Sequence, residues 1–253
     1  MKIFLSVLVL FTTLCAYAQK ADLITVNTVR PKKGQRMAWE TAWKGHVAKF
    51  HAGTEKTNVY QILSGPNSGF YHIVGPVGTF ADLDKQRPDA EVHNLDLDKT
   101  FFPMLEETIN GTYQSIDSLG IRPGAAAEAY VVTVRHLKEG LSLQDYRKEL
   151  SRNAKIRATQ KSALWESIST NYYEQLWDGS DQVTVTIRNL KDGFKSLAQS
   201  YYPVDPPGST SFRDLYSKAY GNEAWDARVK LLDDAVVKTE QYIMKYRKDL
   251  SSK

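Results

Sequence analysis

Short segments in which hydrophobic and polar residues alternate recur along the chain, and they predict strands. Residues 23–30 and 130–136 alternate in this way, and each leads through a lysine-containing turn into a stretch whose apolar residues have helical spacing. Residues 59–65 and 173–179 each precede a turn rich in Gly, Pro, Asn, Asp or Ser and a second alternating segment, which predicts two β-hairpins. The same succession of elements therefore occurs twice, as a weak internal repeat.

The predicted helices have one apolar face each. In the first helix this face consists of Trp39, Trp43, His46 or Val47, and Phe50. In the second half, Ser142 precedes Asp145 by three residues and is expected to cap a helix. The last long helix repeats the spacing with Trp225, Val229, Leu232 and Val236. Residues 203–210 contain three prolines and are expected to form a loop that separates this helix from a shorter one.

Each half is expected to end in a strand after its long helical segment, at residues 119–123 and 244–248. The order in each half is then strand, helix, strand, strand, helix, strand, which is the split β-α-β arrangement of a ferredoxin-like domain. We therefore predict an α+β protein with two tandem ferredoxin-like halves, the first over residues 19–124 and the second over residues 125–253.

The first eighteen residues have the pattern of a signal peptide. Lys2 precedes the apolar run 3–14, and small residues end the segment at Ala18. Cleavage after Ala18 removes Cys15, the only cysteine, so we expect a secreted or periplasmic protein that folds without disulfides. A lipoprotein with its lipid on Cys15 is the alternative. The apolar run is shorter than a spanning helix, and no transmembrane anchor is expected.

The tandem pattern, the aromatic-rich first helix and the closing segments that contain Arg-Pro or Arg-Lys-Asp together resemble the dimeric α+β barrel superfamily. That superfamily includes antibiotic-biosynthesis-type and haem-degrading monooxygenases. The resemblance covers nearly all of the chain after residue 18, and it is one of pattern without a specific motif. It implies that two four-stranded sheets close into a barrel with helices outside, here within a single fused chain.

The resemblance also implies candidate ligand-binding residues. Haem-degrading members use an Asn on the first strand, a Trp and a His, and hold the cofactor between sheet and helices. Asn27, Trp43 and His46 match this set, and His72 lies on the third predicted strand. Because His46 follows Trp43 by three residues, both side chains can project from one side of the helix, where a neutral imidazole could ligate iron or act as a base.

The alternative is that Trp43 and His46 are core residues between helix and sheet, and that Asn27 faces a neighbour or solvent. The enzyme interpretation requires Asn27, Trp43 and His46 to point into one cavity of about 300 Å³ or more.

Other chemistry is not indicated by the sequence. On a continuous helix His46 and His51 diverge by about 140°, which argues against a shared metal, and the acidic residues around His93 are explained by an exposed helix start. The sequence has no Gly-x-Ser-x-Gly motif, no phosphate loop and no thiol after residue 18. We therefore predict no metal and no cofactor, with haem as the alternative.

A predicted helix over residues 147–161 is strongly basic, with one acidic residue, Glu149, against six basic ones: Arg147, Lys148, Arg152, Lys155, Arg157 and Lys161. It could dock an acidic partner or form the solvated outer face of a barrel helix. The net charge of +4 for the whole chain argues against nucleic-acid binding by an exported protein.

Together these features predict an exported α+β-barrel protein that binds a small apolar or aromatic ligand between sheet and helices. The alternatives are a monooxygenase-like enzyme of the same superfamily, with or without haem, and a structural envelope or partner-binding protein. The sequence does not decide between an enzyme and a binding protein.

Overall fold

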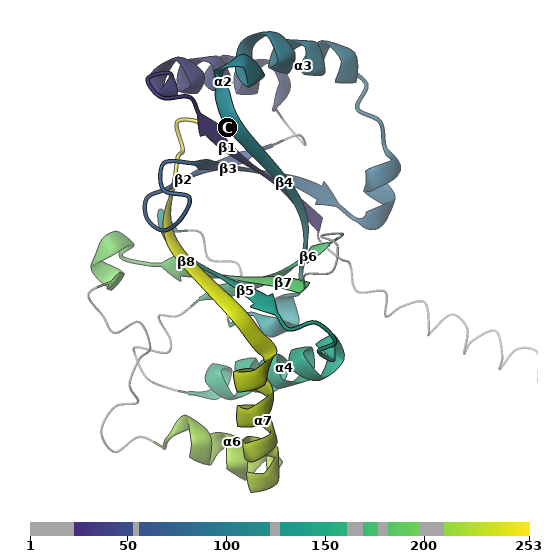
Figure 1. The fold of residues 1–253 in the computed structure, drawn as a ribbon, viewed down its shortest axis with the longest axis vertical. Coiled ribbons are helices and arrows are strands. Elements are labelled where there is room, and N and C mark those ends of the chain that lie inside the picture. The colour runs from purple at the N-terminus through teal and green to yellow at the C-terminus, as the bar shows by residue number, and fades with distance from the viewer. Residues whose placement is uncertain (1–22, 53–55, 122–126, 161–168, 177–181, 198–209) are drawn as a thin grey trace, which may run out of the picture.

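In the computed structural model eight strands form a closed barrel in the order β1-β3-β2-β8-β5-β7-β6-β4, with every neighbouring pair antiparallel (Figure 1). The structure describes residues 23–52, 56–121, 127–160, 169–176, 182–197 and 210–253. The strands are β1 (Leu23–Pro31), β2 (Asn58–Ile62), β3 (Tyr71–Gly78), β4 (Leu105–Ser115), β5 (Ala129–Leu137), β6 (Thr170–Leu176), β7 (Gln182–Leu190) and β8 (Val236–Tyr246). The predicted barrel is thereby confirmed.

Helices cover the outside of this barrel. Figure 1 shows α2 (Arg36–Phe50) and α3 (Ala90–Asp96) on one side, and α4 (Leu143–Thr159), α6 (Phe212–Tyr220) and α7 (Asn222–Ala235) on the opposite side. After α3 the chain continues through a π-helical turn, η3 (Leu97–Phe101), and a short 3₁₀ turn, η4 (Phe102–Met104), which contains Pro103. None of the helices in the described ranges has both the length and the apolar character that crossing a membrane requires.

Side chains of each strand alternate between the barrel interior and the outer face beneath the helices. The interior cluster is built on Val132, Val183, Val185 and Met244 with tyrosines around it. The outer cluster of the first half packs α2 on the sheet through Trp39, Trp43, Val59, Tyr71, Ile73, Phe101 and Leu250. The apolar stripe predicted for α2 is confirmed, because all five of its residues are buried.

The predicted cap at Ser142 is confirmed. Its hydroxyl oxygen accepts a hydrogen bond from the backbone N–H of Asp145 at the start of α4, and Ser211 accepts one from Asp214 at the start of α6 in the same way. Both predicted hairpins are present as β2–β3 and β6–β7. Of the predicted loop at 203–210 only residue 210 lies within the described ranges, and the predicted signal peptide lies outside them.

The predicted closing strands were correct only in part, because residues 244–246 lie at the end of β8, whereas the described residues 119–121 lie in no strand. The first half closes with β4, which ends at Ser115, whereas Leu119 belongs to a single 3₁₀ turn, η5 (Asp117–Leu119). In the second half α7 ends at Ala235, and β8 begins at Val236, which the sequence had placed on the helix. Residues 106–110 and 237–239 are exposed, so neither strand has the hydrophobic alternation on which the prediction relied.

The basic helix α4 is partly neutralised by contacts within the chain. Arg147 forms an ion pair with the buried carboxylate of Glu174 on β6, and Arg152 pairs with Glu149 at 2.6 Å. The guanidinium of Arg157 lies 3.9 Å from the ring centroid of Phe212 on α6. Much of the predicted charge therefore contributes to packing of the second half.

Candidate functional site

A cavity of about 310 Å³ lies between the outer face of the first-half sheet and the helices that cover it. Its sheet wall comes from β1, β3 and β4, and its helix wall from α2, α3 and η3. Asn27, Trp43 and His46 all border this cavity, which is the geometry that the enzyme interpretation requires. Trp43 and His46 are at the same time core residues, with exposed fractions of 3% and 2%.

His72, the fourth candidate, does not belong to this site. Asn27 and Thr28 are adjacent on β1, so their side chains face opposite sides of the sheet, and His72 lies beside Thr28. Its Nδ1 is 2.8 Å from the Thr28 hydroxyl, its Nε2 is 2.9 Å from the Tyr242 hydroxyl, and it borders a separate cavity of about 360 Å³ inside the barrel. Burial lowers the pKa of His72 to about 4.

Three histidines converge at the helix wall of the first cavity. The Nε2 atom of His46 lies 3.1 Å from Nε2 of His93 and 3.3 Å from Nε2 of His51, and the His51 and His93 Nε2 atoms are 3.3 Å apart. His46 comes from α2 and His93 from α3, while His51 directly follows the last residue of α2. One nitrogen of each ring therefore points to a common centre, and we call these residues the histidine triad.

This arrangement corrects the prediction that His46 and His51 could not share a ligand. The predicted divergence of about 140° holds only on a continuous helix, whereas His51 has left the helix, with φ −116° and ψ 57°. The Gly53 that follows two residues later in the sequence was a signal that the helix ends here. The sequence assigns the residues around His93 to an exposed helix start and indicates no role for His93 itself. In the structure the His93 ring instead contacts His46 on α2.

Polar neighbours orient the rings of His46 and His93. His46 Nδ1 donates to Asp96 Oδ2 at 2.8 Å, so the Nε2 of a neutral His46 carries a lone pair. His93 Nδ1 lies 3.2 Å from Asn94 Oδ1. Burial lowers the pKa of His46, and the hydrogen bond to Asp96 opposes this only in part. The hydrogen bond from His46 in turn lowers the pKa of Asp96.

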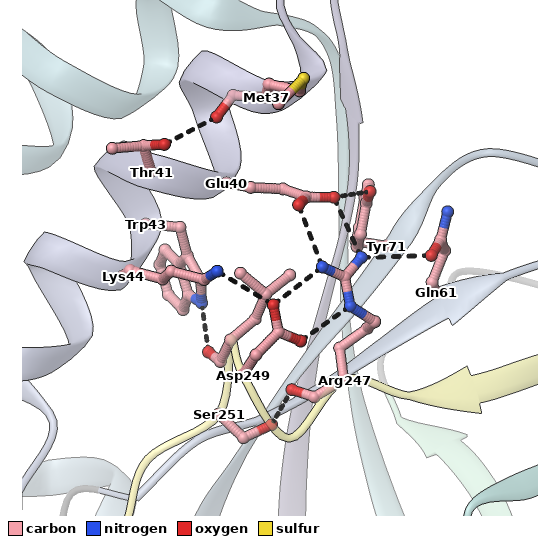
Figure 2. A network of polar contacts seen from close by, with 11 residues as sticks. Met37, Glu40, Thr41, Trp43, Lys44, Gln61, Tyr71, Arg247, Asp249 and Ser251 are labelled. Carbon is pink, nitrogen blue, oxygen red and sulfur yellow. Dashed lines mark hydrogen bonds and ion pairs between the residues drawn. The ribbon is translucent and has the colours of Figure 1, made fainter.

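The C-terminal segment fixes helix α2 in place (Figure 2). The indole N–H of Trp43 donates to the backbone oxygen of Leu250 at 2.9 Å, and Arg247 forms an ion pair with Glu40. Trp43 in turn stacks on His46 with a centroid distance of 5.3 Å. Residues that follow the last strand of the second half thus position the helix that carries the candidate site.

The second half has a cavity in the corresponding place, between its sheet and helices α4 and α7. It measures about 450 Å³, and four arginines border it: Arg135, Arg157, Arg188 and Arg228. No histidine borders it among the described residues. The two halves therefore offer different chemistry at equivalent positions.

Solved structures with similar folds support the resemblance seen in the sequence. A putative monooxygenase from Lactobacillus acidophilus NCFM matches with a TM-score of 0.54 and 8% identity, over 92% of this chain and 96% of that chain. A mutant chlorite dismutase from Candidatus Nitrospira defluvii, in complex with cyanide, matches with a TM-score of 0.50 and 8% identity, over 92% and 93% of the two chains. No protein-family model and no curated protein sequence matches the chain.

These matches define the class of fold. The chain shares with them a closed eight-stranded antiparallel barrel covered by helices, with all eight strands supplied by one polypeptide. At identities this low the likeness concerns the fold and does not transfer an activity.

Haem, the alternative cofactor, does not fit the histidine triad. An iron held by His46 Nε2 must be surrounded by the porphyrin plane, which lies roughly perpendicular to the iron–nitrogen bond. The Nε2 atoms of His51 and His93 stand 3.3 Å and 3.1 Å from that of His46, within the space that the macrocycle needs. A small ligand or a single ion suits this geometry better than a porphyrin.

Proposed function

We propose that the chain is an exported protein that binds a small, largely apolar or aromatic molecule in the cavity beneath α2. The observation that supports this most strongly is the cavity of about 310 Å³ that Asn27, Trp43 and His46 border together. This volume is at the lower end of the range for small-molecule sites. The ligand would therefore be of the size of one or two aromatic rings.

The chemistry of the walls indicates how such a molecule would be held. Trp43, Phe101 and Ile73 supply apolar and aromatic surface. On the opposite wall Asn27 of β1 is the direct partner of Asn110 of β4, and both residues are exposed, so two carboxamides lie side by side where the cavity meets solvent. Each carboxamide can donate to and accept from a hydroxyl, carbonyl or carboxylate group of a ligand.

The proposal includes the tandem organisation of the chain. Within residues 19–124 the strands neighbour one another in the order β2-β3-β1-β4, and within residues 125–253 in the equivalent order β6-β7-β5-β8. The connections are strand, helix, strand, strand, helix, strand in both, apart from extra helical segments. Two ferredoxin-like halves explain this repetition. Export through a signal peptide over residues 1–18 would place the protein in the periplasm or outside the cell.

A monooxygenase-like activity on the bound molecule is the second candidate. The similarity to a structure described as a putative monooxygenase, with a TM-score of 0.54, favours it, as does the aromatic wall of the cavity. Oxygen uptake in the presence of electron-rich phenols would identify such an activity. Binding of those phenols without oxygen uptake would leave the binding function and remove the enzymatic one.

The binding proposal is tested by titrating the purified protein with a panel of small aromatic carboxylic acids and phenols and following tryptophan fluorescence. We expect Asn27→Ala to weaken binding roughly 5- to 30-fold, the loss of one or two hydrogen bonds. Asn58→Ala, at an exposed position on β2, is the matched control and should leave the affinity unchanged. Equal affinity in Asn27→Ala, Asn110→Ala and the unmodified protein would refute binding in this cavity.

A further inference from the structure

We propose that the histidine triad, His46, His51 and His93, is a mononuclear site for a divalent transition-metal ion, with Zn²⁺ favoured by its geometry. The inference goes beyond the small-molecule proposal, since the three imidazoles can bind an ion whether or not an organic ligand enters the cavity.

The distances between the ring nitrogens fit a metal centre. The three Nε2 atoms form a triangle with sides of 3.1, 3.3 and 3.3 Å. Zinc–nitrogen bonds of about 2.0–2.1 Å place two ligand atoms of a tetrahedron about 3.3 Å apart. The triad therefore has the spacing of three corners of a tetrahedral site, without movement of the backbone.

Hydrogen bonding alone cannot satisfy this triangle. Each Nε2 of a neutral imidazole is either a donor or an acceptor, and each of the three atoms lies within 3.3 Å of the other two. Three Nε2 atoms share only these two roles, so at least two of them have the same role. The contact between those two atoms then joins two donors or two acceptors and is not a hydrogen bond. An ion that accepts a lone pair from every nitrogen removes that conflict.

The surroundings of the triad have the features of a metal site. Asp96 accepts the hydrogen bond from Nδ1 of His46 at 2.8 Å, which orients the ring and leaves Nε2 to bind an ion. Asn94 Oδ1 lies 3.2 Å from Nδ1 of His93 and can act in the same way. Such carboxylate–histidine–metal arrangements are usual around bound zinc.

The ligand set also restricts the metal. Three neutral imidazoles without a carboxylate or thiolate suit Zn²⁺, Cu²⁺, Ni²⁺ or Fe²⁺, and they suit the oxygen-seeking ions Mg²⁺ and Ca²⁺ poorly. All three rings border the cavity of about 310 Å³, which leaves room for a fourth, non-protein ligand. Three protein ligands and one exchangeable position are typical of catalytic rather than structural zinc.

The test uses the protein as it is produced by the cell, without further truncation. The protein is treated with a chelator and dialysed, and it is then titrated with ZnSO₄ in a calorimeter. We expect one Zn²⁺ per chain, and visible absorption bands of tetrahedral Co²⁺ when CoCl₂ replaces zinc. His93→Ala should weaken zinc binding at least 100-fold, whereas His136→Ala, which removes a histidine outside the triad, should not. Circular dichroism of each variant shows whether it is folded.

A second pair of variants tests the orienting carboxylate. Asp96→Asn should weaken zinc binding 10- to 100-fold, while Asp98→Asn, two residues away on η3, should have no effect. Absence of stoichiometric binding, or equal affinity in His93→Ala and the unmodified protein, would overturn the proposal. The aromatic-ligand titration repeated in chelator separates the two functions, because loss of the metal site would leave an Asn27-dependent affinity in place.

Discussion

Arg247 and Glu40 lie 207 residues apart in the chain and form a two-pronged ion pair, with both nitrogen–oxygen distances at 3.0 Å. Glu40 also accepts a hydrogen bond of 2.6 Å from the Tyr71 hydroxyl, and Asp249 accepts two more from the same guanidinium (Figure 2). These contacts join the segment after β8 to helix α2. The segment that follows β8 thereby helps to hold α2, the helix that forms one wall of the first cavity.

Removing this ion pair should destabilise the protein markedly. The side chains of Arg247 and Glu40 are only 19% and 17% exposed, so Arg247→Met leaves a largely buried carboxylate without its cation. We expect the free energy of unfolding to fall by about 2–4 kcal/mol, measured by equilibrium denaturation. Lys44→Met removes a half-exposed partner of Asp249 and should cost less than about 1 kcal/mol. An equal decrease in the free energy of unfolding of the two variants would show that the Arg247–Glu40 pair stabilises the protein no more than an exposed ion pair does.

The buried histidine inside the barrel predicts a pH dependence of stability. The pKa of His72 is about 4 in the folded protein, below the ordinary value of about 6.5, because the folded state disfavours the charged ring. As the pH falls from about 6.5 to 4, the unfolded chain takes up a proton that the folded chain does not. The free energy of unfolding should therefore decrease over this window, by as much as about 3 kcal/mol.

Denaturation at a series of pH values measures this effect. His72→Gln should make the profile less steep between about pH 4 and 6.5, since it removes one of the two histidines whose pKa is lowered by burial and leaves the other, His46. His136→Gln, at a position that does not border the barrel cavity, should retain the slope. A slope that is the same in all three proteins would exclude His72 as its source.

Two glycines of the β2–β3 hairpin provide a matched comparison of steric fit. Both have positive φ, +84° at Gly65 and +90° at Gly69. A Cβ at Gly65 would lie 2.8 Å from the backbone oxygen of Gln241 and 2.9 Å from Cβ of Tyr242, whereas one at Gly69 meets nothing within 4 Å. Gly69→Ala should cost about 1–2 kcal/mol for its backbone conformation. Gly65→Ala should cost clearly more, by thermal denaturation, because the hairpin must move away from β8.

Leu250 should be a sensitive position although only three residues follow it in the sequence. Its exposed fraction is 1%, and it packs in the outer cluster with Trp39 and Trp43. Leu250→Ala should lower the free energy of unfolding by about 2–5 kcal/mol. Val237→Ala, at a position that is 67% exposed, should lower it by less than about 1 kcal/mol. An insensitive Leu250 would mean that the C-terminal segment is not held on α2 in solution.

The sequence predicted those strands in which hydrophobic and polar residues alternate along most of the length. β1, β5 and the two hairpins show this alternation, although β5 is buried on both of its faces, and α2 is identified by its aromatic stripe. The extents of β4 and β8 were not predicted, because residues 106–110 and 237–239 near their starts are exposed and interrupt the alternation. These two strands are determined by their pairing with neighbouring strands, and a local sequence pattern does not reveal that pairing.

The candidate site was predicted in part. Asn27, Trp43 and His46 were correctly grouped at one cavity, because residue spacing on a strand and on a helix fixes which face a side chain occupies. His72, the fourth candidate, borders the cavity inside the barrel instead, since the face it occupies depends on the register with β1. The histidine triad was missed because it needs the end of α2 and the docking of α3, and both are tertiary features.

The barrel closes through two junctions, β2–β8 and β4–β6, whose strands all belong to one polypeptide. Ring closure is therefore an intramolecular equilibrium that dilution does not shift, unlike a ring assembled from separate subunits. A single chain has a second consequence. Identical subunits must carry identical residues on both walls, whereas here one wall carries imidazoles and the other guanidiniums.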